Sequence, residues 1–169
     1  SAQRAAWDAL AAADPEPKYN SLGELVAMSG WQYFIRCNTR RAKLSLAPLS
    51  VAPTGSEATR PTAKTLDNFT VDTAGAGEFS GDWDNTADPT GGYGIVTCSV
   101  FPSQAREYVP VRNYWMLGVP VATAAFNNYA RFVDVFGDGI PNYTVIGQFY
   151  IQNLSGLRST GETIRTVIT

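Results

Sequence analysis

Residues Tyr93–Phe101 (YGIVTCSVF) carry the clearest secondary-structure signal in the chain. Aromatic and β-branched side chains dominate this stretch, and such residues favour β-strands. A glycine-containing turn (TGG, residues 90–92) comes shortly before it. We therefore predict a β-strand here and look for similar runs, bounded by turn residues, in the sequence on either side.

The same signal recurs from Leu66 to the C-terminus, where the apolar residues repeat with a period close to two. Further strands are predicted over residues 66–71, 78–83, 108–119, 129–136, 142–152 and 162–169. About seven strands in roughly 100 residues are typical of an antiparallel β-sandwich. We therefore predict a mainly β chain whose sandwich domain spans residues 66–169.

Residues 1–48 show helical periodicity instead and predict a short N-terminal helical hairpin. Its helices are expected over Ala2–Ala13 and Gly30–Lys43. The sequence SGWQ at 29–32 has the spacing of a capping box, in which serine and glutamine side chains bond the free backbone N–H groups at a helix start. Residues 49–65 are rich in proline, threonine, glycine and serine, so we expect an extended linker.

The composition excludes several kinds of chemistry. The chain has no histidine, so a Ser-His-Asp triad and a His-ligated zinc site are ruled out. Neither a dinucleotide-binding GxGxxG, a Walker A motif nor a GxSxG motif occurs. We therefore expect no enzymatic activity, no cofactor, no metal ion and no small-molecule substrate. Cys37 and Cys98 lie in apolar segments and are expected to be buried free thiols.

The net charge of −2, with 17% charged residues, predicts little attraction to nucleic acid or to an anionic membrane. No apolar run is long enough to span a bilayer, which needs about 18 residues or more. We therefore expect neither a nucleic acid nor a membrane as a partner.

Two groups of acidic residues are candidate functional sites. Asp82, Asp84 and Asp88 resemble the start of a calcium loop, but the glycine and the late glutamate of that loop are missing. Asp134 and Asp138 form a catalytic carboxylate pair only if the fold brings them together. Turn chemistry explains both groups without a ligand, the second as a Gly-Asp-Gly hairpin turn.

Arg36, Arg40 and Arg41, with the lysine that follows, form the one basic cluster of the sequence. They are candidates for contact with an acidic partner subunit, a phosphate or an acidic lipid. The alternative is a solvated helix end, where positive charge is favourable in itself. Residues 1–60 contain seven basic and five acidic residues, whereas residues 61–169 contain six basic and ten acidic residues. This asymmetry favours a contact between the basic N-terminal part of the chain and a partner.

Aromatic residues supply the other candidates for a subunit contact. A helical hairpin of this size cannot bury Trp7, Trp31 and Phe34 by itself, and it therefore needs a partner surface from its own sandwich or from another subunit. Tyr114 and Trp115 are adjacent, so in a strand one of them faces away from the core. We select Trp7 and Trp115, together with the three arginines, as candidate contact residues.

The second half of the chain resembles a known module. Trp83 ends one predicted strand, and residues 143–149 (YTVIGQF) are followed by NLSGLRS and a last strand. This pattern is similar to fibronectin type III modules, in which a tryptophan on the second strand packs under a tyrosine-bearing strand. The resemblance covers residues 66–169 and implies an immunoglobulin- or fibronectin III-like sandwich without a reaction of its own. A viral jelly roll is the alternative architecture.

The first half resembles a second group. The segments AQRAAWDAL (2–10), SGWQYFIRCN (29–38) and LAPL (46–49) are similar to uncharacterised proteins encoded by phages, prophages and environmental bacteria. Those proteins pair such a helical head with a fibronectin-like tail. The resemblance implies a structural protein located in the virion.

These observations predict a structural component of a phage or virus particle, in a capsid, decoration or tail role. It would contact copies of itself or other virion proteins. The alternative is a secreted or surface fibronectin-like binding module that recognises a glycan or a protein.

Overall fold

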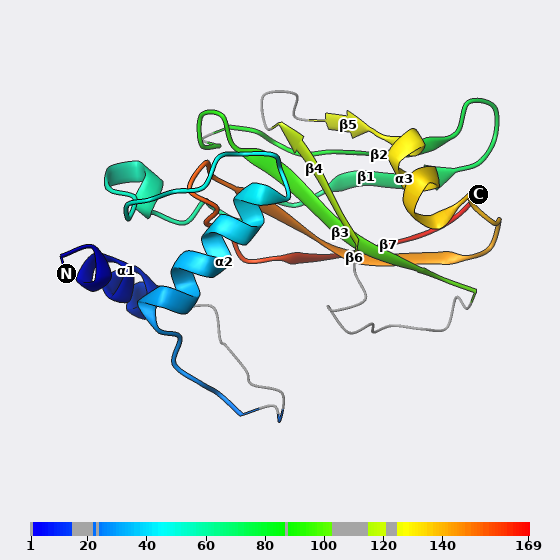
Figure 1. Ribbon diagram of the computed structural model, residues 1–169. Coiled ribbons are helices and arrows are strands. Elements are labelled where there is room, and N and C mark those ends of the chain that lie inside the picture. Colours follow the sequence, from blue (N-terminus) through cyan, green and yellow to red (C-terminus); the bar gives the residue numbers. More distant parts are fainter. Residues whose placement is uncertain (1, 15–21, 23, 87, 103–114, 121–124) are drawn as a thin grey trace. The chain divides into compact units, whose positions relative to one another are not determined.

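The computed structural model describes residues 2–14, 22, 24–86, 88–102 and 125–169, and the backbone of residues 115–120 (Figure 1). The chain divides into two compact units. The helical unit contains Ser1–Arg60 and Asn153–Leu157, and the β unit contains Pro61–Gln152 and Arg158–Thr169. The boundary after Arg60 falls inside the stretch that the sequence predicts to be a linker.

The helical unit contains α1 (Ala2–Ala13), α2 (Gly30–Ala42) and the 3-10 turn η1 (Gly55–Ala58). Both predicted helices are present, and α2 ends one residue earlier than predicted. The capping box is present as well. The Ser29 hydroxyl accepts a hydrogen bond from the Gln32 backbone N–H at 3.3 Å, and the Gln32 side chain accepts one from the Ser29 N–H at 2.9 Å. Such a cap stabilises a helix by about 1 kcal/mol.

The core of the helical unit includes a residue from near the other end of the chain. Its buried apolar residues are Trp7, Ala11, Tyr33, Cys37, Ala52 and Leu157. Leu157 is 1% exposed and belongs to the turn between the last two strands. Cys37 is buried and free, as predicted. The predicted hairpin is therefore completed by residues that the sequence assigned to the sandwich.

Hydrogen bonds hold the turn 153–157 inside the helical unit. The Asn153 side chain donates to the carbonyl oxygens of Glu57 and Thr59, both at 3.1 Å. The Glu57 carboxylate accepts from the Ser155 backbone N–H at 3.1 Å and from its hydroxyl at 2.9 Å. Asn153 and Ser155 are both buried, so these bonds satisfy polar groups that would otherwise destabilise the unit.

Two antiparallel sheets form the β unit in the part of the chain that the structure describes (Figure 1). The order of one sheet is β1-β2-β5, with β1 (Asp67–Asp72), β2 (Glu78–Asp82) and β5 (Ala125–Asn127). The order of the other is β4-β3-β6-β7, with β4 (Trp115–Pro120), β3 (Tyr93–Phe101), β6 (Thr144–Gln152) and β7 (Glu162–Val167). The chain is thus rich in antiparallel β-structure and mixed with helices, rather than clearly all-β.

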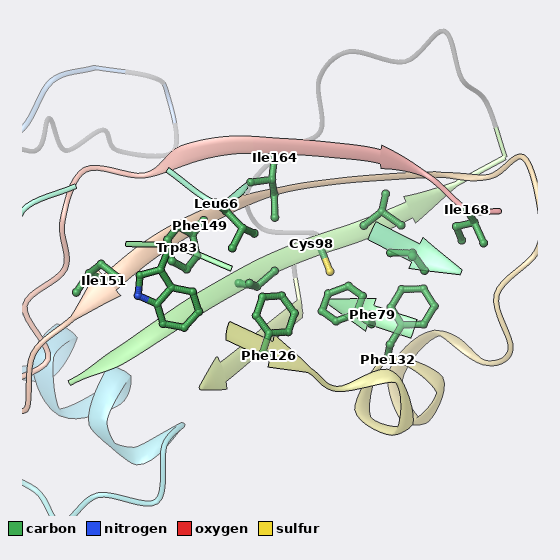
Figure 2. Packing of buried hydrophobic residues seen from close by; sticks show 13 residues of the cluster. Leu66, Phe79, Trp83, Cys98, Phe126, Phe132, Phe149, Ile151, Ile164 and Ile168 are labelled. Atoms are coloured by element: carbon green, nitrogen blue, oxygen red, sulfur yellow. The ribbon is translucent and has the colours of Figure 1, made fainter. Parts of the chain in front are cut away.

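The two sheets share one apolar core (Figure 2). The three-stranded sheet contributes Val71, Phe79 and Phe126, and the four-stranded sheet contributes Val96, Cys98, Val145, Phe149, Ile151 and Ile164. Trp83, directly after β2, packs against Phe149 of β6 with 5.3 Å between the ring centroids. Cys98 is buried and free, as predicted.

The prediction of a strand over Tyr129–Phe136 is wrong, because this segment is the helix α3. Its apolar residues fit both periods, since Tyr129, Phe132 and Phe136 also recur on one helix face. Phe132 is buried and stacks on Phe79 of β2, with 5.1 Å between the ring centroids. This packing favours the helix. The Gly-Asp-Gly sequence at 137–139 accordingly follows a helix and is not a hairpin turn.

The strand predicted over residues 108–119 corresponds in part to β4, and residues 108–114 lie outside the described residues. The short strand β5 was not predicted. Of the helices that the structure describes, none has the length and apolar character needed to cross a membrane.

Candidate interaction surface on the helical unit

The basic cluster that the sequence predicts as a contact surface has partners within the helical unit. Arg36 and Arg60 lie 3.7 and 3.1 Å from the carboxylate oxygens of Asp14. The Asp14 side chain is only 2% exposed, and the Tyr33 hydroxyl is hydrogen-bonded to it. Burial, reinforced by the negative charge of Asp14, raises the pKa of Tyr33 well above its usual value. Arg36 therefore belongs to a network that links α2 to the end of α1.

Arg40 and Arg41 bind backbone carbonyl groups of the same unit. Arg40 donates to the carbonyl oxygen of Gly156 at 3.3 Å. Arg41 donates through Nε to the carbonyl oxygen of Ala47 at 2.8 Å and through a terminal nitrogen to that of Leu154. All three arginines of the predicted cluster thus hold the helical unit together. Arg40 and Arg41 also lie in the last turn of α2, where positive charge complements the helix dipole.

The tryptophans of the helical unit divide between its core and its surface. Trp7 is 5% exposed and packs edge-to-face against Phe34, with 5.4 Å between the ring centroids. Trp31 is 66% exposed and stacks on the same Phe34 at 5.2 Å. The exposed tryptophan ring is therefore that of Trp31 and not that of the predicted contact residue Trp7. Trp115 begins β4 opposite Cys98, and its side chain lies outside the described part of the chain.

Two hollows of about 550 and 400 Å³ lie along α2 and share Phe34 as a wall. We call them together the α2 groove. The residues that α2 contributes to their walls include Trp31, Phe34, Ile35, Asn38, Thr39 and Ala42. Gln3 and Arg4 of α1 line one end, and Leu46, Pro48 and Ser50 line the side formed by the following segment.

Polar side chains in the α2 groove bond the backbone of the helical unit. Asn38 donates to the Leu49 carbonyl at 3.2 Å and accepts from the Leu49 N–H at 2.6 Å. Gln3 accepts from the Ala52 N–H at 2.9 Å. These bonds fix the segment that follows α2 against the two helices. The exposed surface of the groove is mostly apolar.

Exposed large apolar side chains concentrate on the helical unit. Among the described residues, this unit carries Leu22, Leu25, Val26, Trp31, Ile35, Val51 and Leu154, and the β unit carries Ile140. Of these residues, Trp31 and Ile35 also line the α2 groove, whereas single exposed apolar side chains are ordinary on a protein surface. The sequence shows the face of α2 only as an i, i+3, i+4 repeat, which does not distinguish a buried face from an exposed one.

The three acidic residues that resemble the start of a calcium loop have separate structural partners. Asp82 accepts from an asparagine side chain of β1 at 3.0 Å, and Asp88 accepts from the Trp83 indole N–H at 3.0 Å. Hydrogen bonds from the side chain and the backbone of Thr86 lower the pKa of Asp84. Within the described residues, no group of three or more Asp, Glu, Cys or His side chains is placed to hold a metal ion.

The candidate carboxylate pair consists of Asp134, near the end of α3, and Asp138, in the segment that follows α3. Asp134 is 3.8 Å from Arg131, and both side chains are more than half exposed. Asp138 borders a hollow of about 200 Å³ together with Ile140. An exposed ion pair of this kind contributes little to stability, about 0–1 kcal/mol.

The chain was compared with protein-family models, curated proteins and solved structures. No protein-family model matches the chain, and neither a curated protein nor a solved structure matches it.

Proposed function

We propose that the protein is a structural subunit of an assembled particle, namely a phage or virus particle, and that it acts through contacts between subunits. The observation that carries this proposal is the α2 groove, where Trp31 and Ile35 are exposed beside an apolar hollow. Burial of apolar surface against another protein stabilises the contact by about 25 cal/mol per Å². The resemblance of the N-terminal segments to phage-encoded proteins supports the choice of particle.

We further propose that the β unit is an immunoglobulin- or fibronectin III-like sandwich that serves as a scaffold. If its strands are lettered A to G in chain order, one sheet contains A, B and E and the other contains C, F and G. That grouping is shared with immunoglobulin domains. The fourth strand, β4, pairs with β3, where variable-type domains add a strand to the same sheet.

Two aromatic residues support this assignment. Trp83 follows the second strand and packs on Phe149 of β6, as the fibronectin resemblance implies. Tyr143 directly precedes β6, the position of the tyrosine corner in immunoglobulin-like folds. The sandwich would hold the helical unit in a particle without taking part in a reaction.

The mass of the purified chain across a dilution series tests the proposal. We expect the average mass to rise above the monomer value of 18.2 kDa as the concentration increases. A series from about 1 µM to about 1 mM covers binding free energies from about −8 to about −4 kcal/mol. A monomer at every concentration, with a cooperative melt, contradicts the proposal. That result favours a secreted or surface binding module, which a screen of glycans and proteins then tests.

A pair of variants locates the contact. Trp31→Ala removes an exposed ring from the helical unit. We expect it to lower the average mass, while the loss of the stack on Phe34 lowers the melting temperature only slightly. Ile140→Ala is the matched control, because Ile140 is 51% exposed and belongs to the β unit. An equal effect of both variants contradicts a contact through the α2 groove.

A further inference from the structure

The residues that α2 contributes to the α2 groove form one stripe along the helix. Counted from the first residue, they recur at positions +3, +4, +7, +8 and +11, a spacing that keeps them on one helix face. The members of the stripe are Trp31, Phe34, Ile35, Asn38, Thr39 and Ala42. At 1.5 Å per residue, the stripe is about 16 Å long. It therefore extends over nearly the whole of α2.

The stripe carries no charge. The arginines of α2 contact Asp14 and carbonyl groups of the unit instead. Arg4, the charged residue in the described walls, lies 3.9 Å from Asp8, so positive and negative groups are balanced at that end. An uncharged face loses little hydration against an equally uncharged face, whereas binding of a nucleic acid or an acidic protein depends on cationic groups. The partner that fits is an uncharged, partly apolar helix face.

We propose that this partner is a second copy of the chain, and that the α2 helices of the two copies pack antiparallel across a two-fold axis. The inference rests on the proposed function, because it identifies the subunit that the α2 groove contacts. A second α2 presents a face of the same length and the same uncharged chemistry. Two-fold pairs are the commonest arrangement of identical subunits.

The size of the side chains favours the antiparallel direction. Trp31 lies at the N-terminal end of the stripe and Ala42 at the C-terminal end. Antiparallel packing therefore places each large ring over a small residue of the other copy, so that the surfaces interdigitate. A parallel pair would place Trp31 against its own copy. It would also bring Arg41 and Lys43 of both copies together, and like charges repel.

The contact is expected to be weak by itself. A stripe of about 16 Å covers less surface than the roughly 800 Å² per partner of a standard protein interface. Many such contacts acting together in a particle would bind far more tightly than one pair in solution. The pair should therefore form at high concentration and dissociate on dilution.

Sedimentation of matched variants tests the surface. Ile35→Arg places a charge in the middle of the stripe at a side chain that is 45% exposed, and Ala9→Arg places the same charge on an exposed position of α1 outside both hollows. We expect Ile35→Arg to raise the dimer dissociation constant about tenfold or more, because a charge in a contact centre is costly. Ala9→Arg should leave the constant unchanged. Ala42→Arg is the second stripe variant and should act like Ile35→Arg, because it fills the space that Trp31 of the other copy requires.

Disulfide trapping tests the direction. We expect a mixture of Trp31→Cys and Ala42→Cys chains to form a mixed disulfide on mild oxidation. Ala42→Cys alone should not form one, because antiparallel packing separates the two copies of residue 42 by about 16 Å, whereas a disulfide needs Cα atoms within about 7 Å. Cys37 and Cys98 are both buried, so the unsubstituted chain is the control for background oxidation.

The outcomes separate this contact from the proposed function. An unsubstituted chain that stays monomeric at every concentration overturns both. A dimer that persists in Ile35→Arg and Ala42→Arg, or one that yields the disulfide of Ala42→Cys with itself, overturns the antiparallel contact alone. In that case the protein still assembles, but through another surface.

Discussion

A Cβ atom added to Gly156 would lie 2.6 Å from the carbonyl oxygen of Cys37. Gly156 belongs to the turn 153–157 and has a φ of +83°, and Cys37 belongs to α2 and is fully buried. A side chain at position 156 would separate the turn from the helix. We therefore expect Gly156→Ala to lower the free energy of unfolding by about 2 kcal/mol or more, because it adds a clash to a strained backbone.

Gly55→Ala is the matched control for this substitution. Gly55 also has a positive φ, +61°, but no atom lies within 4 Å of an added Cβ. Its loss of stability measures the backbone strain alone, about 1 kcal/mol. Urea unfolding of both variants then isolates the contact between Gly156 and Cys37. Equal losses in the two variants contradict a close approach of turn and helix.

Leu157 and Leu154 form a second matched pair within the same turn. Leu157 is 1% exposed in the core with Trp7, whereas Leu154 is 37% exposed. We expect Leu157→Ala to lower the free energy of unfolding by about 3 kcal/mol and Leu154→Ala by less than about 1 kcal/mol. The hydrogen bond from Arg41 goes to the Leu154 carbonyl and survives the substitution. Denaturant titrations followed by tryptophan fluorescence measure the difference.

Asp14→Asn removes the charge that faces Arg36 and Arg60. Because the Asp14 side chain is 2% exposed, the loss leaves positive charge beside a buried amide, and we expect a destabilisation of about 3 kcal/mol. Asp134→Asn is the control, since its ion pair with Arg131 is exposed and contributes less than about 1 kcal/mol. Thermal unfolding at low and high salt compares the two. A loss of similar size in both variants rules out the buried network as a source of stability.

Because of the buried thiol of Cys37, we expect the free energy of unfolding to depend on pH in the alkaline range. Burial raises the pKa of Cys37 from 9.0 to about 11. The folded chain therefore binds this proton more tightly than the unfolded chain. The stabilisation that results from the protonated thiol is complete below about pH 9 and is lost as the pH rises through about 11. A difference of two pKa units corresponds to at most about 3 kcal/mol.

Urea unfolding at a series of pH values measures this contribution, and Cys37→Ala serves as the reference. We expect the free energy of unfolding of the unsubstituted chain to fall more steeply above about pH 9 than that of Cys37→Ala. Parallel curves would show that the thiol titrates alike in both states. Cys98, whose pKa is raised by burial to about 12, acts in the same direction and is present in both chains.

Signals from neighbouring residues were sufficient to predict several elements of the fold. The strand β3 has the bounds that its aromatic and β-branched residues predict, Tyr93–Phe101. The start of α2 follows from the capping box of Ser29 and Gln32. These signals act between residues within one turn or one strand, so no distant contact is needed to recognise them. The number and spacing of the predicted strands also led to the expectation of antiparallel β-structure.

Other features of the fold depend on contacts between residues that are far apart in the sequence. Tyr129–Phe136 fits both a strand and a helix, and the stacking of Phe132 on Phe79 favours the helix. In the sequence, Arg36, Arg40 and Arg41 form a basic cluster, and their partners are recognised only when residues far along the chain are placed beside them.

The helical unit shows the same division most clearly. The sequence by itself determined that its two helices form, because alanine-rich periodicity and capping are properties of neighbouring residues. Only the tertiary structure decided that Leu157 completes their core and that Trp7 is buried while Trp31 is exposed. The physical reason is that burial depends on which surfaces meet in space, and residues on one helix face are equivalent until a distant segment covers some of them.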